Sequence, residues 1–359
     1  MPAAPLDGVR YRSLDHWRGF AALWVLVFHG FNVWREARPD LLPRWLGGFI
    51  SHGWLGVHVF FVVSGYCITE RIVREHARGG GGLGFLVDRL WRIYPPYWAA
   101  LILAILLNVA GAFAKGQSVG HPGVLPEGWM WFAAGLTVEP WMGQPSFLLV
   151  AWSLAYEIGF YLVAAAGLFL ARKTRRPWVG FAWGAAWGAL GLLPAVAAQV
   201  PLLALWPHFA LGGIVWLLLH RVDSAGRRVA FGLLLFGTIF AASWLQPAAP
   251  RFQLQFACGC ALLLLGLRPW DDRLAGFPAL RWLGWTGTFS YSLYLIHAPI
   301  VGKTRNLLGR LWSPDDPRAL GLQCAGCLLA VAAAWLFYRL IELRSEAYRK
   351  SPRTPTAPA

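Results

Sequence analysis

A basic side chain and an imidazole stand within the first long apolar run of this sequence. Arg18 and His29 are eleven residues apart, which is about three turns of an α-helix, so both would lie on one helix face. Asp15 falls close to the same face. Ionisable residues inside membrane helices are costly and usually mark function. His29 is therefore a candidate for proton transfer, and a hydrogen bond between two helices is the structural alternative.

A second cluster of polar and aromatic residues lies near the start of the apolar segment 151–171: Trp152, Ser153, Tyr156 and Glu157. Ser153 and Glu157 have i, i+4 spacing, which places them on one face of a helix. A carboxylate in an apolar environment needs a partner. We expect Glu157 to take part in acid–base chemistry at a depth comparable to that of His29, and a structural tie to another helix is the alternative.

A third group follows later in the chain, again inside an apolar run. Ser290, Tyr294 and His297 have i, i+4, i+7 spacing and so share one helix face. Together with His29 and Glu157, His297 would complete a set of groups suited to general acid–base catalysis.

Two further positions could contact a substrate. His58 could approach the same set from near the outer rim, although a residue of the membrane interface fits it equally well. Arg89 and Arg92 are i, i+3 neighbours at the start of the apolar segment 94–113. Two guanidinium groups that face one way can bind phosphates with paired hydrogen bonds; ordinary cytoplasmic charge is the alternative.

The composition predicts an integral membrane protein. Of the 359 residues, 57% are hydrophobic and 14% are charged, whereas a soluble domain carries about 25% charged residues. The net charge of +15 is spread between the apolar runs and forms no single patch, so we expect no binding to nucleic acid. The five cysteines are interpreted as small buried hydrophobic residues, and no metal site is expected.

Apolar runs of about 20 residues predict the spans. They favour an all-α fold, a polytopic membrane helical bundle with ten transmembrane helices, near 18–34, 53–70, 94–113, 151–171, 178–197, 202–220, 229–246, 252–267, 284–302 and 319–341. An eleventh apolar stretch, 129–142, is short and contains Glu139 and Pro140, which is typical of a re-entrant or interfacial segment.

The distribution of Lys and Arg predicts the topology. Segments 71–92 and 172–176 are rich in these residues, so both are expected in the cytoplasm, and an even number of crossings must separate them. Segment 129–142 should therefore not cross, and both termini should be cytoplasmic. We expect one membrane domain over 1–345, followed by a disordered cytoplasmic tail over 346–359.

Five segments, taken in order, resemble the acyltransferase family 3 of membrane O-acyltransferases. They are Leu14 to Gly19 with His29, Gly53 to Tyr66, Arg89 to Pro95, Trp152 to Glu157, and Ser290 to His297. The departures are small. His16 replaces the more usual glycine, and Glu157 is the single carboxylate where the family pattern often has two.

The resemblance implies transfer of an acyl group, commonly acetyl, from cytoplasmic acyl-CoA to a hydroxyl of a carbohydrate, a lipid-linked glycan or another exported acceptor. It implies the bacterial inner membrane, no permanently bound cofactor, and acetyl-CoA as co-substrate. The residues that match the family motifs or lie beside them fall into three sets. The catalytic set is His29, Glu157 and His297; the donor-binding set is Arg18, Arg89 and Arg92; the substrate-positioning set is Asp15, His58, Trp152, Ser153, Tyr156, Ser290 and Tyr294.

A transporter or flippase without acyl-transfer chemistry is the main alternative. Polar groups inside a ten-helix bundle would suit it as well. The sequence has no internal repeat and no matching pair of spans broken by Gly or Pro, so the acyltransferase is favoured.

Overall fold

The computed structural model describes residues 11–37, 42–125, 128, 148–311 and 316–350. Within these ranges the chain is helical and contains no strand, which confirms the all-α fold. The first half comprises α1 (Leu14–Ala37), α2 (Arg44–Ser51), α3 (Gly56–Ala77), α4 (Gly82–Phe113), α6 (Trp152–Lys173), α7 (Pro177–Gly191), α8 (Pro194–Gln199) and α9 (Pro201–Ala204). The second half comprises α10 (Trp206–Arg221), α11 (Ala225–Ala242), α12 (Ala248–Leu267), α13 (Asp271–Gly276), α14 (Arg281–Thr288), α15 (Ser290–Leu311), α16 (Pro317–Phe337), the π-helix η6 (Tyr338–Glu342) and α17 (Leu343–Lys350).

Among the described residues, seven helical segments are long and apolar enough to cross a membrane, and each overlaps one of the ten predicted spans. They are Arg44–Ala77, Gly82–Phe113, Trp152–Lys173, Leu202–Arg221, Ala225–Leu245, Ala248–Gly276 and Arg318–Arg349. The protein is therefore an integral membrane protein, and the predicted count of ten crossings is not confirmed by this measure. The other three predicted spans fall on α7, which has only 15 residues, and on α1 and α15, which carry the polar residues singled out above.

Two predictions concern segments at the margins of the described residues. The proposed re-entrant segment 129–142 lies outside them. The tail predicted to be disordered from residue 346 is helical as far as Lys350, because α17 continues there. Arg349 in this helix bonds to Asp88 of α4 over 2.9 Å, which explains why the helix persists. Residues 351–359 are outside the described part.

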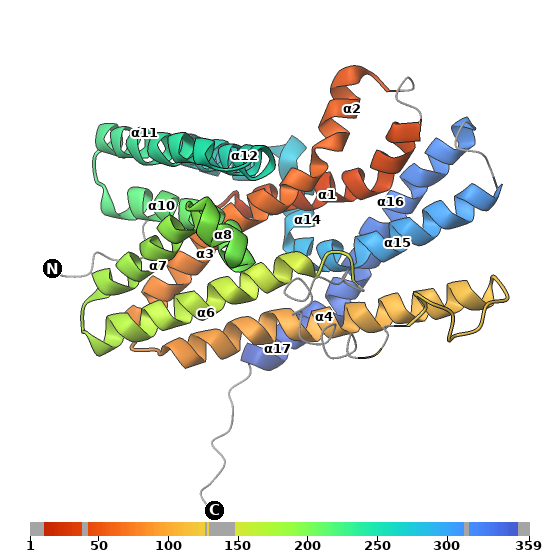
Figure 1. Cartoon of the computed structure of the whole chain (residues 1–359), viewed down its shortest axis with the longest axis horizontal. Helices are drawn as coiled ribbons and strands as arrows, with labels where there is room; N and C mark the ends of the chain where they lie inside the picture. Colours follow the sequence, from red (N-terminus) through yellow and green to blue (C-terminus); the bar gives the residue numbers. More distant parts are fainter. Residues whose placement is uncertain (1–10, 38–41, 126–127, 129–147, 312–315, 351–359) are drawn as a thin grey trace, which may run out of the picture.

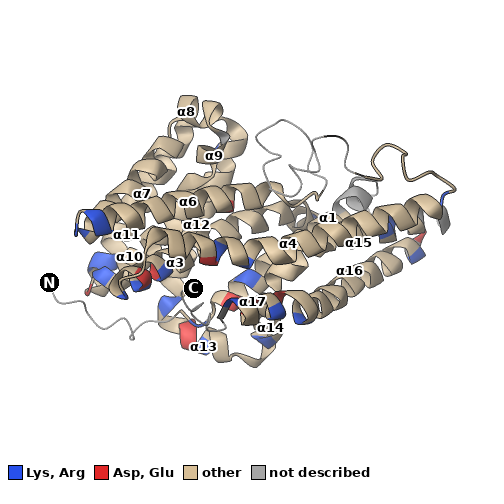
Figure 2. Ribbon diagram, turned by 90° about the horizontal axis from the view of Figure 1, so that it is seen from below, with Lys and Arg blue, Asp and Glu red and all other residues tan. Residues whose placement is uncertain are grey.

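Long helices run roughly along the long axis of the molecule, with α4 and α6 side by side (Figure 1). Charged residues are sparse along the middle of the long helices and gather near their ends (Figure 2). This distribution is expected of helices whose middle parts lie in hydrocarbon.

Close helix contacts fix the positions of α1 and α3. A Cβ atom on Gly287 of α14 would lie 1.8 Å from the backbone oxygen of Asp15 in α1. One on Gly65 of α3 would lie 2.0 Å from the oxygen of Phe209 in α10. Small residues allow such approaches, which stabilise helix pairs in membranes. The start of α1 is also anchored by Asp271, a fully buried carboxylate that accepts backbone hydrogen bonds just before the helix.

Candidate active site

A narrow cavity of about 70 Å³ lies between α1, α3, α4, α6 and α15. We call it the central cavity. Its polar lining consists of Arg18, Ser64, Arg92, Ser153, Glu157, Tyr161, Ser290, Tyr291 and Tyr294. Its apolar lining consists of Val57, Phe60, Phe61, Val63, Ile93 and Leu154. The cavity has room for several water molecules or a slender chain, and its walls bring together residues from segments far apart in the sequence.

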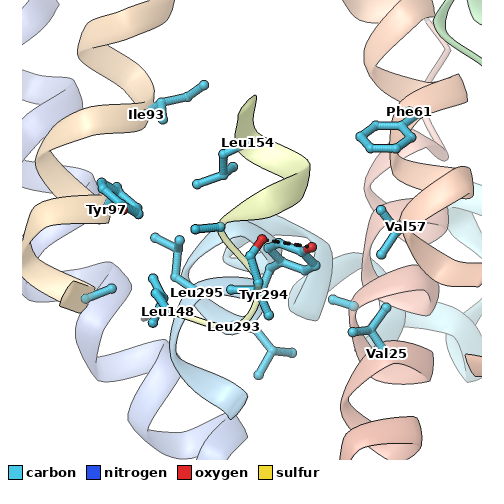
Figure 3. Packing of buried hydrophobic residues seen from close by; sticks show 14 of the residues in the cluster. Val25, Val57, Phe61, Ile93, Tyr97, Leu148, Leu154, Leu293, Tyr294 and Leu295 are labelled. Carbon is cyan, nitrogen blue, oxygen red and sulfur yellow. Dashed lines mark hydrogen bonds between the residues drawn. The ribbon is translucent and has the colours of Figure 1, made fainter. Parts of the chain in front are cut away.

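Part of the lining belongs to the main buried cluster (Figure 3). Leu154 and Tyr294 lie between Ile93 of α4 and the pair of Val57 and Phe61 on α3 (Figure 3). The polar groups of the site are thus held in a rigid apolar frame, which fixes their geometry.

Two arginines line the cavity, but not the two that the sequence places in one motif. Arg18 and Arg92 line it, whereas Arg89 does not. Arg89 is 8% exposed and donates to Asp88, with contacts of 3.2 Å from Nε and 2.5 Å from Nη2. Asp88 also accepts a hydrogen bond from Arg349. The structure therefore groups Arg92 with Arg18 and gives Arg89 a place in an ion-pair network that joins α4 to α17.

Glu157 lies in the cavity, but its described hydrogen bonds do not go to a histidine. Tyr161 donates to Oε1 of Glu157 over 2.5 Å, and Ser64 lies at 3.5 Å from the same oxygen. The expected grouping of Glu157 with the two histidines is therefore not what the structure brings together. The reason is axial position: Glu157 lies one turn, about 6 Å, beyond Ser153 along α6, and Ser153 is the residue that meets α15.

Ser153 and Tyr294 close one part of the cavity wall. Oγ of Ser153 lies 2.7 Å from the hydroxyl of Tyr294. Ser153 also donates to the backbone oxygen of Val150 at 3.1 Å, and Tyr294 contacts the same oxygen at 3.3 Å. The hydrogen bond of Tyr294 is visible among the apolar side chains of Figure 3. Both side chains are buried, and both also line the central cavity.

The two histidines at the far side of this contact touch each other. Nε2 of His297 lies 3.1 Å from Nδ1 of His29, and the ring of Tyr294 lies 6.0 Å from that of His297. Nδ1 of His297 lies 2.9 Å from the backbone oxygen of Leu293. A carbonyl only accepts, so Nδ1 of His297 carries a hydrogen and Nε2 of the neutral ring accepts one from His29.

The same reasoning assigns the protons of His29. Its Nδ1 must carry the hydrogen, since both neighbours of that atom, Nε2 of His297 and the oxygen of Val25 at 3.0 Å, are acceptors. Nε2 of neutral His29 then holds a free electron pair. His29 is half-buried and His297 is fully buried, so His29 is the more accessible base of the pair.

The remaining predicted positions are divided between the cavity and its surroundings. Ser290 lines the cavity, and its buried hydroxyl has no partner among the described atoms. Asp15 lies 3.9 Å from Arg18. Trp152 and Tyr156 pack edge to face at 6.0 Å without lining the cavity.

His58 does not join His29 and His297. Its ring instead packs at 4.8 Å from that of His208 in α10, and both side chains are buried. The α3–α10 contact directs it there, because the close approach at Gly65 turns this face of α3 towards α10.

Sequence reasoning did not single out Ser64, Tyr161 or Tyr291, which all line the cavity. Tyr161 continues the i, i+4 series of Ser153 and Glu157, so the helix face itself could have revealed it. In the described part of the chain, no group of three or more His, Cys, Asp and Glu residues could hold a metal ion.

The chain is similar in sequence to several known proteins. The chain is 24% identical to the peptidoglycan O-acetyltransferase OatA of Listeria monocytogenes, over 92% of this chain and 55% of that protein. It is 27% identical to a protein of Komagataeibacter xylinus provisionally named membrane-bound transacylase BcsY, over 97% and 86% of the two chains. It is also 27% identical to a protein of Staphylococcus aureus strain COL provisionally named O-acetyltransferase SACOL0978, over 92% and 56%.

The chain spans about half the length of the Listeria and Staphylococcus relatives. No solved structure matches it. The family described as an acyltransferase domain matches residues 11–339. Since this match covers nearly all of the 359 residues, the chain belongs to acyltransferase family 3.

Proposed function

We propose that the protein is a membrane O-acyltransferase that moves an acetyl group from acetyl-CoA to a hydroxyl of a cell-envelope carbohydrate. One observation carries the proposal: a cavity lined by two arginines reaches the Ser153–Tyr294 contact, directly beside the His29–His297 pair. An anionic thioester donor and a base are the two components that acyl transfer to a hydroxyl requires.

Arg18 and Arg92 are the proposed donor site. Guanidinium groups form paired, charge-assisted hydrogen bonds with phosphates, and coenzyme A carries several phosphate charges. The nucleotide is proposed to lie against the two guanidinium groups while the pantetheine arm enters the central cavity. The names of the Listeria and Staphylococcus relatives, both O-acetyltransferases, support acetyl as the acyl group. Arg89 supports the site indirectly, through Asp88.

His29 is the proposed general base. Its free Nε2 accepts the proton of the acceptor hydroxyl, and the hydroxyl oxygen attacks the thioester carbonyl carbon. The carbon–sulfur bond then breaks, an ester forms, and the thiolate of coenzyme A leaves. The proton held on His29 passes to that thiolate, which restores the neutral imidazole.

His297 is proposed to position His29 rather than to take a proton itself. Both of its ring nitrogens already have partners, Leu293 and His29. It fixes the tautomer and rotation of the His29 ring, as a second group does for many catalytic histidines. Ser290 and Tyr294 are proposed to contact the arm of the donor or the acceptor in the cavity.

The proposed setting is the bacterial inner membrane, with both termini and the donor site on the cytoplasmic side. Peptidoglycan is the acceptor in the name of the Listeria relative, which supports an envelope glycan as the acceptor class.

The deciding experiment is a donor assay with purified protein. Acetyl-CoA and peptidoglycan fragments are supplied, and free coenzyme A thiol and acetylated glycan are measured. We expect thiol release coupled to ester formation. A transporter would release no thiol, and that result would reject the proposal. Mass spectrometry of envelope glycans with and without the gene then identifies the acceptor.

A further inference from the structure

Glu342 is a buried carboxylate that the proposed chemistry does not use. Only 4% of its surface is exposed, and it ends the π-helix η6. Single π-turns within helices are rare and occur frequently at functional sites. Glu342 also lies beyond residue 339, where the match to the family ends. A buried carboxylate in a membrane bundle is expensive, so a specific contact must compensate for it.

That contact is with Ser292 in the first turn of α15. Oγ of Ser292 donates to Oε2 of Glu342 over 2.5 Å, and Ser292 is fully buried. Hydrogen bonds to a carboxylate are about twice as strong as those between neutral groups. The bond therefore joins the π-turn that follows α16 to the start of the helix that carries His297.

The start of α15 needs support because the chain is not helical just before it. Phe289 separates α14 from α15 with φ −117° and ψ 22°. A rigid helical connection is missing at this residue, so α14 does not fix how α15 is rotated or how far it is shifted. The ring of Tyr338, in the same π-helix, packs 6.3 Å from that of Phe289, which places η6 directly against the break.

Hydrogen bonds from three side chains near the start of α15 fix its rotation and axial position instead. They are Tyr291 to the backbone oxygen of Ile93 in α4 at 2.9 Å, Ser292 to Glu342 in η6 at 2.5 Å, and Tyr294 to Ser153 in α6 at 2.7 Å. Three bonds to three different elements determine both the rotation and the axial position of this turn. His297 follows one turn later, so its distance to His29 depends on them.

We propose that Glu342 is a positioning residue for acyl transfer: by accepting the hydrogen bond of Ser292 it holds Tyr294 and His297 in their working places. This inference rests on the proposed function. Neither Glu342 nor Ser292 lines the central cavity, so their shared hydrogen bond concerns the rate of transfer. The charge of Glu342 also interacts with Arg92 and Arg18, so donor binding is compared in Ser292→Ala, which keeps that charge.

A double-mutant cycle of Ser292→Ala and Glu342→Ala tests the coupling. Small displacements of catalytic groups cost up to about a hundredfold in rate, so we expect each single variant to lower kcat about ten- to hundredfold. For Ser292→Ala, the KM for acetyl-CoA and the Kd of coenzyme A should stay within about twofold of wild type. The double variant should be no slower than the slower single variant, because both substitutions remove the same bond.

Glu342→Gln separates the hydrogen bond from the charge. It keeps an acceptor oxygen for Ser292, so it should restore most of the rate that Glu342→Ala loses. If Glu342→Ala does not fold, Ser292→Ala and Glu342→Gln still decide the matter: the first should be slow and the second active. Ser243→Ala is the matched control, since Ser243 is a fully buried serine that does not line the central cavity. Its hydroxyl donates to the backbone oxygen of Phe240, three residues earlier, and accepts from Gln255.

Three results would overturn the positioning role. They are losses that multiply in the double variant, a Glu342→Gln protein as slow as Glu342→Ala, and single variants as fast as wild type. Failure of the proposed function looks different, because the wild-type protein itself would then release no coenzyme A thiol.

Discussion

Nδ1 of His29 in α1 and Nε2 of His297 in α15 lie 3.1 Å apart, although 268 residues separate them in the chain. The backbone oxygen of Leu293 fixes the proton on the other nitrogen of His297. With the hydrogens assigned in this way, Nε2 of His29 is the ring nitrogen of the pair that keeps a free electron pair. The first two predictions follow from that assignment.

We expect His29→Ala to lower acetyl transfer by about 10²–10⁴-fold, the usual effect of losing a general base. Coenzyme A should still bind, because His29 does not line the central cavity. The measurements are thiol release and calorimetric binding of coenzyme A to the detergent-purified variant. More than about a tenth of wild-type turnover in a folded variant would exclude the role.

His297→Ala should be less harmful than His29→Ala, because His297 orients the base without accepting the substrate proton. We expect a loss of about ten- to hundredfold. The double variant should be about as slow as His29→Ala alone, since the positioning residue acts only through His29. Equal losses in the two single variants, multiplied in the double, would show that each ring acts independently.

Arg18→Lys and Arg92→Lys should each weaken the binding of coenzyme A. Lysine keeps the charge but loses the planar fork, and loss of one charge-assisted contact costs on the order of 1.5–3 kcal/mol, or about ten- to a hundredfold in Kd. Arg89→Lys is the matched comparison on the same helix turn, and its effect should be smaller because Arg89 bonds to Asp88. A larger effect at Arg89 than at Arg92 would show that Arg89 binds the donor, as its motif predicted.

Glu157→Gln should reduce activity strongly. The substitution removes a negative charge from the cavity that Arg18 and Arg92 also line, and an uncompensated buried charge is costly. Tyr161→Phe is the control: it removes the hydrogen bond to Glu157 and leaves the charge in place. Full activity of Glu157→Gln, with loss only in Glu157→Ala, would make Glu157 a packing residue.

The topology can be measured with single cysteines in a background without the five native ones. An impermeant thiol reagent added outside should label position 123, after α4, while positions 80 and 174 should stay protected. Position 145 should behave like 123. Opposite labelling of 123 and 145 would show that segment 129–142 crosses the membrane.

The sequence predicted helix faces better than helix neighbours. The spacing of Ser290, Tyr294 and His297 correctly placed them on one side of a helix, and two of the three line the cavity. It could not tell which residue of α6 faces them, because that depends on the axial offset between two helices. Ser153 rather than Glu157 meets Tyr294 for this reason.

Contacts between side chains that are far apart in the sequence could not be predicted either. Arg89 and Arg92 look alike in their motif, and only the fold brings Arg349 to Asp88 beside Arg89. Glu342 was not singled out because it lies one residue beyond the predicted span 319–341, where a charged residue is ordinary. Its burial depends on the packing of η6 against the start of α15.

The hydrogen-bonded contact of Ser153 and Tyr294 has a consequence for the cell as well as for the reaction. An acyltransferase in a membrane must not also conduct protons, because a continuous file of water would dissipate the membrane potential. Each elementary charge that crosses is worth about 2.3 kcal/mol per 100 mV. The central cavity, at about 70 Å³, can hold only a short row of water, and the hydroxyls of Ser153 and Tyr294 bond to each other in its wall. Because each hydroxyl already has a partner, it offers fewer hydrogen bonds to water, which disfavours a continuous file of water at this point.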